Sequence, residues 1–139
     1  MNVIVDTSVW SLALRRGVPR GTASERELAE LVREGRVLVL GPLRQEVLSG
    51  VREAEQFKAL RDCLRAFPDV TLEVRDYEEA AVCFNRCRSK GVQGSNTDFL
   101  LCAVAMRLGA AILTTDKDFD RFARILRIKL HEPRPELSA

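Results

Sequence analysis

Short aliphatic, β-branched runs, each followed by a longer amphipathic segment, are the feature that most restricts the fold of this chain. A strand buried on both faces has a continuous apolar sequence, and strands that alternate with helices form a parallel sheet. The pattern therefore predicts an α/β fold, a three-layer α/β/α sandwich with a parallel sheet of four to five strands. Strands are expected at residues 2–5, 37–40, 111–114 and 128–130, with a short fifth at 70–74.

Helices are expected between these strands, where apolar residues recur every three or four positions. Two of them carry capping-box signals at their starts, Ser24 with Glu27 and Ser95 with Asp98. The expected ranges are 8–15, 24–33, 42–49, 53–67, 77–90, 96–108 and 119–126.

Length and composition predict one globular domain. The chain has 139 residues, of which 46% are hydrophobic, enough to bury a core. We expect a single domain over residues 1–132 and a loose tail at 133–139. No apolar run approaches the ~20 residues of a membrane span, and no signal-peptide pattern is visible, so a cytoplasmic protein is expected.

Charge and residue counts exclude several kinds of chemistry. A net charge of +2 is too small to indicate a nucleic-acid binder by itself. With His131 as the only histidine, serine–histidine triads and three-histidine zinc sites are excluded. Cys83 and Cys87 are four residues apart and could share a soft metal, but small core thiols are the favoured interpretation.

Two aspartates lie at the carboxyl ends of predicted strands. Asp6 follows the first strand directly, and Asp116 lies two residues after Thr114, at the end of a later strand. Because ligands bind beyond the carboxyl ends of parallel strands, we expect both carboxylates in one crevice. Each also precedes a helix, so each could be an ordinary helix cap.

Two further acids are placed on helices near this edge. Glu46 is expected on the apolar side of its helix beside Val47, where a carboxylate needs a partner or a cation, unless the helix is rotated and Glu46 is solvated. Asp98 begins the most apolar helix and could be only a cap.

The four acids together predict a metal site. Four converging carboxylates repel one another, and hard divalent ions such as Mg²⁺ and Mn²⁺ relieve that repulsion with oxygen ligands. Such a cluster supports metal-assisted hydrolysis of phosphodiesters and needs no histidine.

These residues resemble a PIN-domain ribonuclease, specifically a VapC-like toxin of a type II toxin–antitoxin pair. The resemblance runs from residue 2 to about 130. It implies that Asp6, Glu46, Asp98 and Asp116 form the catalytic quartet that binds Mg²⁺ or Mn²⁺. The matching motifs are VIVDTSVW at 3–10, Glu46 after the second strand, NTD at 96–98 and LTTDKDF at 113–119.

The resemblance also implies supporting residues and partners. Ser8 and Thr114 would support the acids through their hydroxyls, and Asp118 could assist from outside, although Thr115 and Asp118 also fit a capping box. The family implies cleavage of an RNA substrate, a homodimer, and inhibition by a small antitoxin protein that blocks the crevice.

Other interpretations stay open. A haloacid-dehalogenase-type phosphatase needs an aspartate where Ser8 stands. A phospho-receiver domain shares an acidic Mg²⁺ pocket, and a catalytically silent PIN-like binding module is a further alternative. Basic residues near the crevice could bind RNA phosphates or be solvated helix ends; they are Arg15, Arg16, Arg20, Arg86, Arg88 and Lys90.

Overall fold

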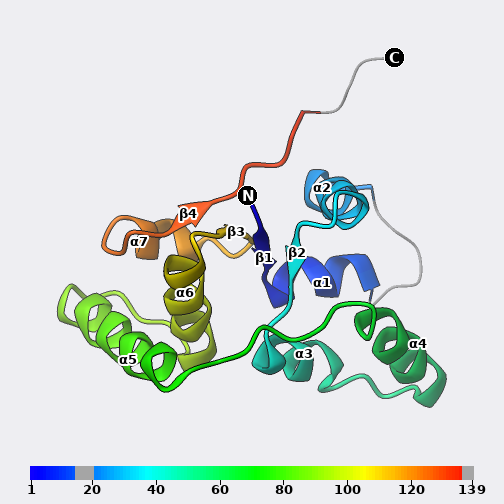
Figure 1. Ribbon diagram of the computed structural model, residues 1–139, viewed down its shortest axis with the longest axis horizontal. Helices are drawn as coiled ribbons and strands as arrows, with labels where there is room; N and C mark the ends of the chain where they lie inside the picture. Colours follow the sequence, from blue (N-terminus) through cyan, green and yellow to red (C-terminus); the bar gives the residue numbers. More distant parts are fainter. Residues whose placement is uncertain (15–20, 136–139) are drawn as a thin grey trace.

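The computed structural model describes residues 1–14 and 21–135 and contains a parallel sheet (Figure 1). Its strand order is β2-β1-β3-β4, so β1 and β3 are the inner strands. All three strand pairs are parallel, which confirms the predicted α/β class. The strands are β1 (Val3–Val5), β2 (Val37–Leu38), β3 (Ala111–Leu113) and β4 (Lys129–Leu130).

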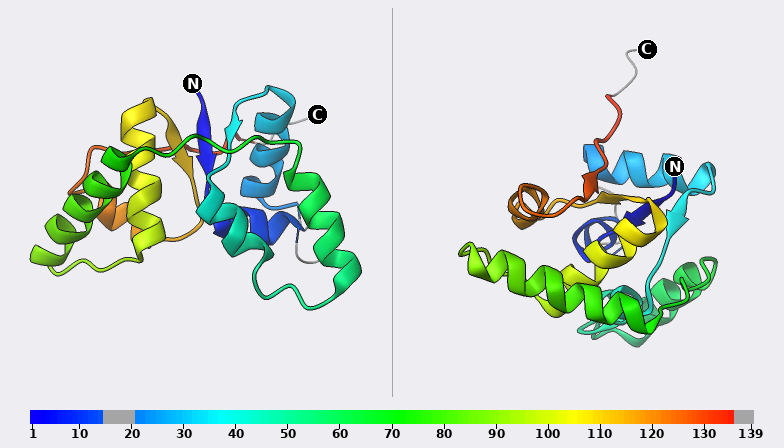
Figure 2. Two further views of the ribbon diagram at one scale, coloured as in Figure 1. Left: turned by 60° about the horizontal axis from the view of Figure 1, so that its bottom comes forward. Right: turned by 60° about the vertical axis from the view of Figure 1, so that its left-hand side comes forward.

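Helices cover both faces of the sheet, as the two further views show (Figure 2). Helices α1 to α4 lie on one side in Figure 1, and α5 to α7 lie on the other. Within the described ranges the helices are α1 (Thr7–Leu14), α2 (Ala23–Arg33), α3 (Gly41–Leu48), α4 (Ala54–Leu64), α5 (Val74–Ser89), α6 (Asn96–Leu108) and α7 (Asp118–Ala123).

Alternation along the strands builds two cores. Val3 and Val5 of β1 pack in one core with α1 and α2, whereas Ile4 packs in the other with α5, α6 and α7. Successive strand side chains point to opposite faces, so one buried strand supplies both cores. The three-layer arrangement is therefore confirmed.

The segment expected to form a fifth strand does not form one. Among the described residues, an isolated parallel bridge pairs Val39 with Asp69, just before this segment, and the Val70 amide donates to the Val39 carbonyl at 2.9 Å. Val74 already begins α5, three residues before the expected start. The sheet in the described residues therefore has four strands.

A buried ion pair explains the early start of α5. Asp76 is 2% exposed, and one of its oxygens accepts the backbone N–H of Glu73 at 2.8 Å. Arg107 at the end of α6 donates to both Asp76 oxygens, at 2.6 and 2.9 Å. The Arg107 hydrogen bonds lower the pKa of Asp76, against the opposing effect of burial.

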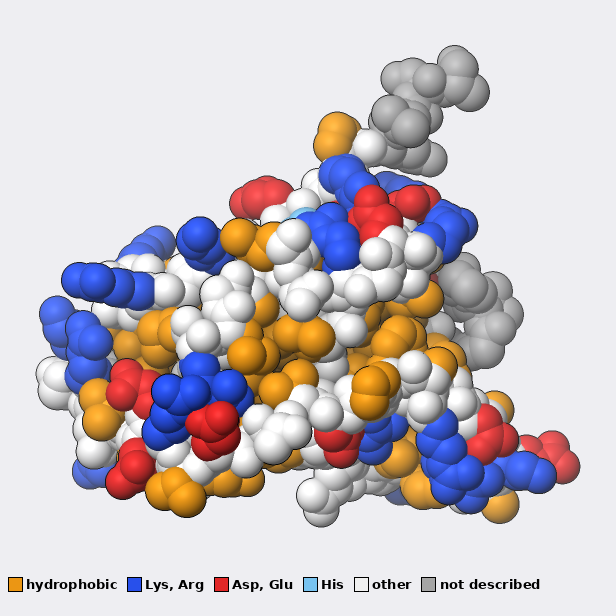
Figure 3. All heavy atoms as spheres, viewed as in Figure 1, with side chains coloured by type: hydrophobic (Ala, Val, Ile, Leu, Met, Phe, Trp, Pro, Cys, Tyr) orange, Lys and Arg blue, Asp and Glu red, His pale blue; other side chains and the backbone are white. Residues whose placement is uncertain are grey.

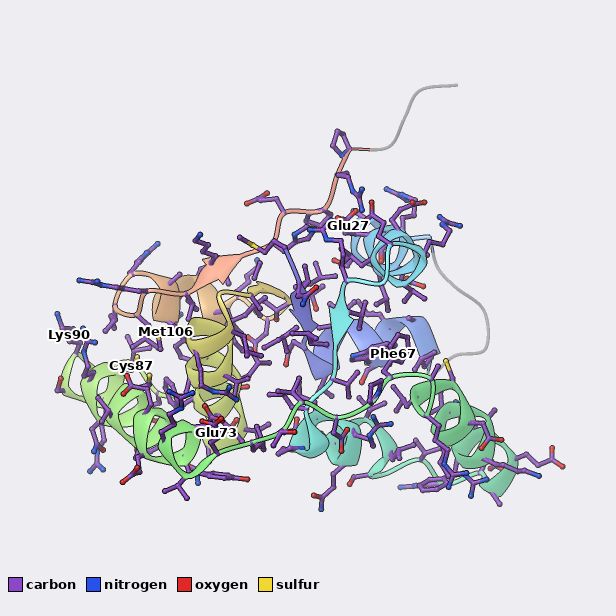
Figure 4. All side chains as sticks on the ribbon, viewed as in Figure 1. Glu27, Phe67, Glu73, Cys87, Lys90 and Met106 are labelled. Carbon is purple, nitrogen blue, oxygen red and sulfur yellow. The ribbon has the colours of Figure 1, made fainter. Side chains whose placement is uncertain are left out.

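The predicted Ser24–Glu27 capping box is wrong. Thr22 caps α2 instead, because its hydroxyl accepts the Glu25 N–H at 3.2 Å. Glu27 is buried and points from α2 toward the C-terminal segment (Figure 4), where it contacts His131 Nε2 at 2.5 Å and Arg134 Nε at 2.9 Å. Burial raises the pKa of Glu27, but these hydrogen bonds outweigh it, so the pKa lies below its ordinary value.

The same contacts fix part of the segment expected to be a loose tail. Arg134 also binds both carboxylate oxygens of Glu34 at 3.0 Å. Arg134 is therefore held against α2, whereas the loose tail expected at 133–139 stays a prediction, because residues 136–139 lie outside the described residues. Among the described residues, no helix is both long and apolar enough to span a membrane.

Candidate active site at the carboxyl edge of the sheet

Asp6 sits at the end of central strand β1, where it joins the strand to α1. Its backbone N–H donates to the Leu113 carbonyl of β3 at 2.9 Å. Its side chain is 6% exposed, and its Oδ2 atom accepts two hydroxyl hydrogen bonds, from Ser8 and from Thr114, each at 2.9 Å. The Asp6 carboxylate is therefore positioned by the two hydroxyl groups.

The two hydroxyls also connect the ends of β1 and β3. The Ser8 and Thr114 oxygens are 3.4 Å apart. Ser8 Oγ accepts the Thr115 N–H at 3.1 Å, and Thr114 Oγ1 accepts the Asp116 N–H at 3.0 Å. The turn that carries Asp116 is thus fixed against the turn that carries Asp6.

Asp116 and Asp118 differ in their contacts. One Asp116 oxygen, Oδ1, accepts the Asp118 N–H at 2.9 Å, just at the start of α7. The predicted Thr115–Asp118 capping box is wrong, because Lys117 occupies the cap position without a side-chain bond. The Asp118 carboxylate is 4.0 Å from Arg121 of its own helix. Within residues 1–14 and 21–135, no contact joins Asp118 to Asp6, Glu46 or Asp98.

Glu46 lies on an exposed flank of α3, so the expectation that it faces the apolar core is wrong. Leu43 and Val47 are the buried residues of that helix. Arg44 anchors the helix, since it donates to Asp69 at 2.9 Å and to two carbonyls, one at the end of α4 and one in the α4–α5 connection. Glu46 instead contacts α1, where its Oε1 atom accepts the Thr7 hydroxyl at 3.2 Å.

Asp98 is a helix cap and a member of the acid group at the same time. It exchanges two hydrogen bonds of 3.1 Å with Ser95, which confirms that predicted capping box. Burial is the main cause that raises the pKa of Asp98, and the negative charges of Asp6 and Asp116 raise it further. The structure therefore brings the carboxylates of Asp6, Asp98 and Asp116 close enough to repel one another.

The acid edge, defined here as Asp6, Glu46, Asp98 and Asp116, has a common hydrogen-bonding pattern. Each carboxylate uses one oxygen to accept hydrogen bonds from its own surroundings, and no described donor contacts the other oxygen. None of the four forms an ion pair with a lysine or arginine of the described residues. Each acid is thus held in place and keeps one oxygen available to a ligand.

This donor set fits a hard divalent cation in charge and chemistry. Carboxylate oxygens are the ligands that Mg²⁺ and Mn²⁺ prefer, and a cation would relieve the repulsion that raises the pKa of Asp98. The four side chains do not form a closed coordination sphere. Within the described part of the chain, no three acid, histidine or cysteine side chains converge at ligand distance.

The cysteines are not part of the site. Cys83, Cys87 and Cys102 are buried in the core between the sheet and α5–α6. Burial raises the pKa of the Cys83 thiol to about 11 and also raises that of Cys102, so these groups stay protonated and apolar. The interpretation of these cysteines as core residues is confirmed.

The basic residues expected near the crevice are resolved only in part. Arg15, Arg16 and Arg20 lie outside the described residues. Arg86 donates to the Ile125 carbonyl at 3.3 Å, and Lys90 lies at the outer end of α5 (Figure 4). Acidic and basic side chains are interspersed over the face shown in Figure 3, without one large basic patch.

Sequence reasoning missed Thr7 as a contact of Glu46. The available signal was the hydroxyl pair Thr7–Ser8 immediately after Asp6, which parallels Thr114–Thr115 before Asp116. One hydroxyl of each pair contacts Asp6, and Thr7 extends the network to α3.

Comparison with known proteins places this arrangement in a family. Residues 3–125 match the PIN domain. The chain is 29% identical over 131 residues to VapC ribonuclease Mb1587 of Mycobacterium bovis, which covers 91% of this chain and 96% of that protein. Ribonuclease VapC11 of Mycobacterium tuberculosis matches with the same identity and coverage. The chain belongs to the PIN domain family.

A solved structure shows the same fold. VapBC2 from Rickettsia felis, bound to a DNA fragment from their promoter, superposes with a TM-score of 0.71 at 17% identity. The superposition covers 94% of this chain and 98% of that one. The two chains therefore share the same overall fold.

Proposed function

We propose that this chain is a metal-dependent endoribonuclease that acts as the toxin of a toxin–antitoxin pair. The observation that carries the proposal is the acid edge, where four positioned carboxylates lack a cationic partner among the described residues. The ribonuclease relatives in the two mycobacteria support the substrate class.

In this proposal Asp6, Glu46, Asp98 and Asp116 hold Mg²⁺ or Mn²⁺. A bound divalent ion supplies activation of water and electrostatic stabilisation of the phosphate during hydrolysis. Ser8 and Thr114 orient Asp6 through their hydroxyl hydrogen bonds, and the Ser95 N–H orients Asp98. These hydrogen bonds fix the orientation of the Asp6 and Asp98 carboxylates at the carboxyl edge of the sheet.

The test is cleavage of an RNA mixture by the purified protein with Mn²⁺, with chelator, and with the Asp6→Asn variant. Cleavage that requires the metal and is lost in the variant is the expected result. A folded protein that leaves RNA intact under all conditions would identify a silent binding module instead. Sequencing of the 5′ ends identifies the RNA positions that are cut.

We further propose a small antitoxin as partner and the cytoplasm as the place of action. The neighbouring VapBC2 structure supports a two-protein assembly. Co-expression with the proposed antitoxin should restore growth and yield a co-purifying complex. Fractionation of the same cells measures whether the protein is found in the cytoplasm.

A homodimer is the third part of the proposal. Helix α5 exposes Val74, Tyr77 and Val82, which are 76%, 55% and 47% accessible in the single chain. Exposed apolar groups on one helix are typical of association surfaces. Light scattering of the wild type and of a Tyr77→Lys variant measures whether the chain is dimeric and whether α5 contributes.

A further inference from the structure

A polar pocket of about 390 Å³ opens beside the acid edge. This volume is in the lower part of the range for sites that bind small organic groups, ~300–1,000 Å³. None of the residues that line it has been assigned to the hydrolytic reaction except Glu46. The lining residues are Thr7, Pro42, Gln45, Glu46, Ser49 and Thr97.

One face of α3 forms a wall of this pocket. Gln45 and Glu46 come three and four residues after Pro42, so these three residues lie on one side of the helix. Ser49, directly after α3, completes this wall. The opposite side carries the buried Leu43 and Val47.

The facing wall comes from the first turns of α1 and α6. Thr7 follows Asp6 directly, and Thr97 precedes Asp98 directly. Thr7 also donates its hydroxyl to Glu46 at 3.2 Å, which joins α1 to α3. A group in the pocket therefore lies next to the position where the scissile phosphate must bind.

The chemistry of the lining favours a neutral polar group over a phosphate. The lining contains three hydroxyls, an amide and the Glu46 carboxylate, but no lysine or arginine of the described residues. A phosphate there would be repelled by Glu46. A nucleobase is neutral, planar and rich in donors and acceptors along its edge.

Gln45 is suited to read such an edge. Its amide offers both a carbonyl acceptor and NH₂ donors, the combination that pairs bidentately with a base edge. Gln45 is exposed, and its amide has no hydrogen-bond partner within the described ranges. The Gln45 amide can therefore bind a base without first breaking an internal contact.

We propose that this pocket binds the base of the nucleotide adjacent to the scissile phosphate, and that Gln45 determines which base is accepted. The inference rests on the proposed ribonuclease activity and names a specificity residue for it. Recognition of single-stranded RNA through unstacked bases is the common mode for sequence-selective RNA-binding proteins.

The first experiment measures base preference on an RNA library randomised around the cut site. Wild type, Gln45→Ala and Gln93→Ala are each incubated with Mn²⁺, and the 5′ ends are sequenced. Gln93 is an exposed glutamine in the α5–α6 loop, outside this pocket, and serves as the matched control. In Gln45→Ala, the preference at one position beside the cut should fall about tenfold, the size of one bidentate contact.

Gln93→Ala should keep the wild-type preference. The proposal is overturned when wild type shows no base preference beside the cut, or when Gln45→Ala keeps the full preference.

The second experiment does not depend on cleavage. Adenosine, cytidine, guanosine and uridine are titrated separately into ¹⁵N-labelled protein without metal, and amide signals are followed by NMR. The Gln45 side-chain NH₂ signal, assigned by its loss in Gln45→Ala, and the Thr97 backbone signal should shift with the preferred nucleoside. The Thr97 shift should be lost in Gln45→Ala.

These outcomes separate the two proposals. Absence of cleavage together with the nucleoside shifts contradicts the ribonuclease and supports a base-binding pocket. Cleavage without nucleoside shifts at Gln45 and Thr97, or a Thr97 shift that persists in Gln45→Ala, overturns the role of Gln45.

Discussion

Two groups of acids in this molecule have opposite electrostatic surroundings. Asp76 and Glu27 are almost completely buried, and each is neutralised by an arginine within 3 Å. At the acid edge, Asp6 is almost as buried, yet its carboxylate receives only hydroxyl groups. The chain has 22 lysines and arginines, so a shortage of basic residues does not explain why none of them pairs with the acid edge in the described part of the chain.

The difference separates acids that stabilise the fold from acids that are costly to it. A buried carboxylate with an arginine partner keeps a lowered pKa, as Asp76 does. Burial raises the pKa of Asp98, and the negative charges of Asp6 and Asp116 raise it further, without an arginine partner among the described residues to lower it. Charge repulsion that the fold does not relieve is left for a ligand to relieve, which is the pattern of a functional site.

The largest expected effect is on activity at the acid edge. Under the proposed function, Asp6→Asn should reduce Mn²⁺-dependent RNA cleavage about a thousandfold or more, because the proposed metal-binding quartet loses a carboxylate. Toxicity on expression should disappear with it. The stability of the fold should be preserved, since the amide oxygen still accepts from Ser8 and Thr114.

The control for that variant is Asp120→Asn, which changes an exposed aspartate of α7 outside the quartet. Cleavage rates of the three proteins and their melting curves make the comparison. Undiminished cleavage by a folded Asp6→Asn protein would remove the proposed metal role.

An acid that is paired with an arginine should affect the stability of the fold and not the cleavage rate. Asp76→Asn should lower the free energy of unfolding at neutral pH by about 3 kcal/mol, because it leaves the Arg107 bonds without their charged acceptor. The pKa of Asp76 is lowered in the fold, so its stabilisation is present above the ordinary value of 3.8 and is lost as pH falls through the folded-state pKa.

Urea unfolding of wild type and Asp76→Asn from neutral to acidic pH measures this dependence. The two stabilities should converge below the ordinary aspartate pKa. A constant difference across the whole range would show that the ion pair is not its source.

Asp98 tests the acid edge by stability alone. Its raised pKa means that, without metal, the stability of wild type falls as pH rises above 3.8 through the folded-state pKa. Asp98→Asn should remove this fall and keep the Ser95 cap, so metal-free stability should hold or rise. Mn²⁺ at a hundred times its Kd should stabilise wild type by ~2.7 kcal/mol and the variant much less.

Thermal melts with chelator and with Mn²⁺ give both quantities for each protein. If wild type shows no response to Mn²⁺ and the variant is destabilised equally in both conditions, Asp98 is a helix cap and no more.

The smallest expected effect concerns the second paired acid. Glu27→Gln should destabilise the protein by about 2 kcal/mol, the usual size of lost hydrogen bonds to a charged group. Amide hydrogen exchange at His131 and Arg134 should accelerate, because these two residues lose their shared charged acceptor. Glu55→Gln, an exposed position on α4, is the matched control, and equal exchange in both variants would contradict this role.

Local signals predicted the parts of the molecule that depend on neighbours in sequence. Helix α6 begins and ends where expected, because Ser95 and Asp98 cap its start and Gly109 adopts a left-handed conformation at its end, with φ 63°. Asp6 and Asp116 were predicted to share an edge because parallel strands align their carboxyl ends. The ranges of all helices were predicted to within three residues.

Features set by distant residues were not predictable from local pattern. The orientation of Glu46 follows from Arg44, which binds residues 64 to 69 and fixes the rotation of α3. The start of α5 depends on Arg107, 31 residues from Asp76. Glu27 was expected to be a local cap partner, but its partners are more than 100 residues away.

The hydrogen bond between Thr114 and Asp6 joins residues 108 positions apart. During synthesis, the segment that carries Asp6 is complete long before the ribosome reaches β3. Contacts of such long sequence separation form late, because the intervening chain must first be ordered. A nascent or truncated chain that ends before Asp116 therefore lacks the assembled site, and under the proposed function such a chain cannot damage the RNA of the cell that makes it.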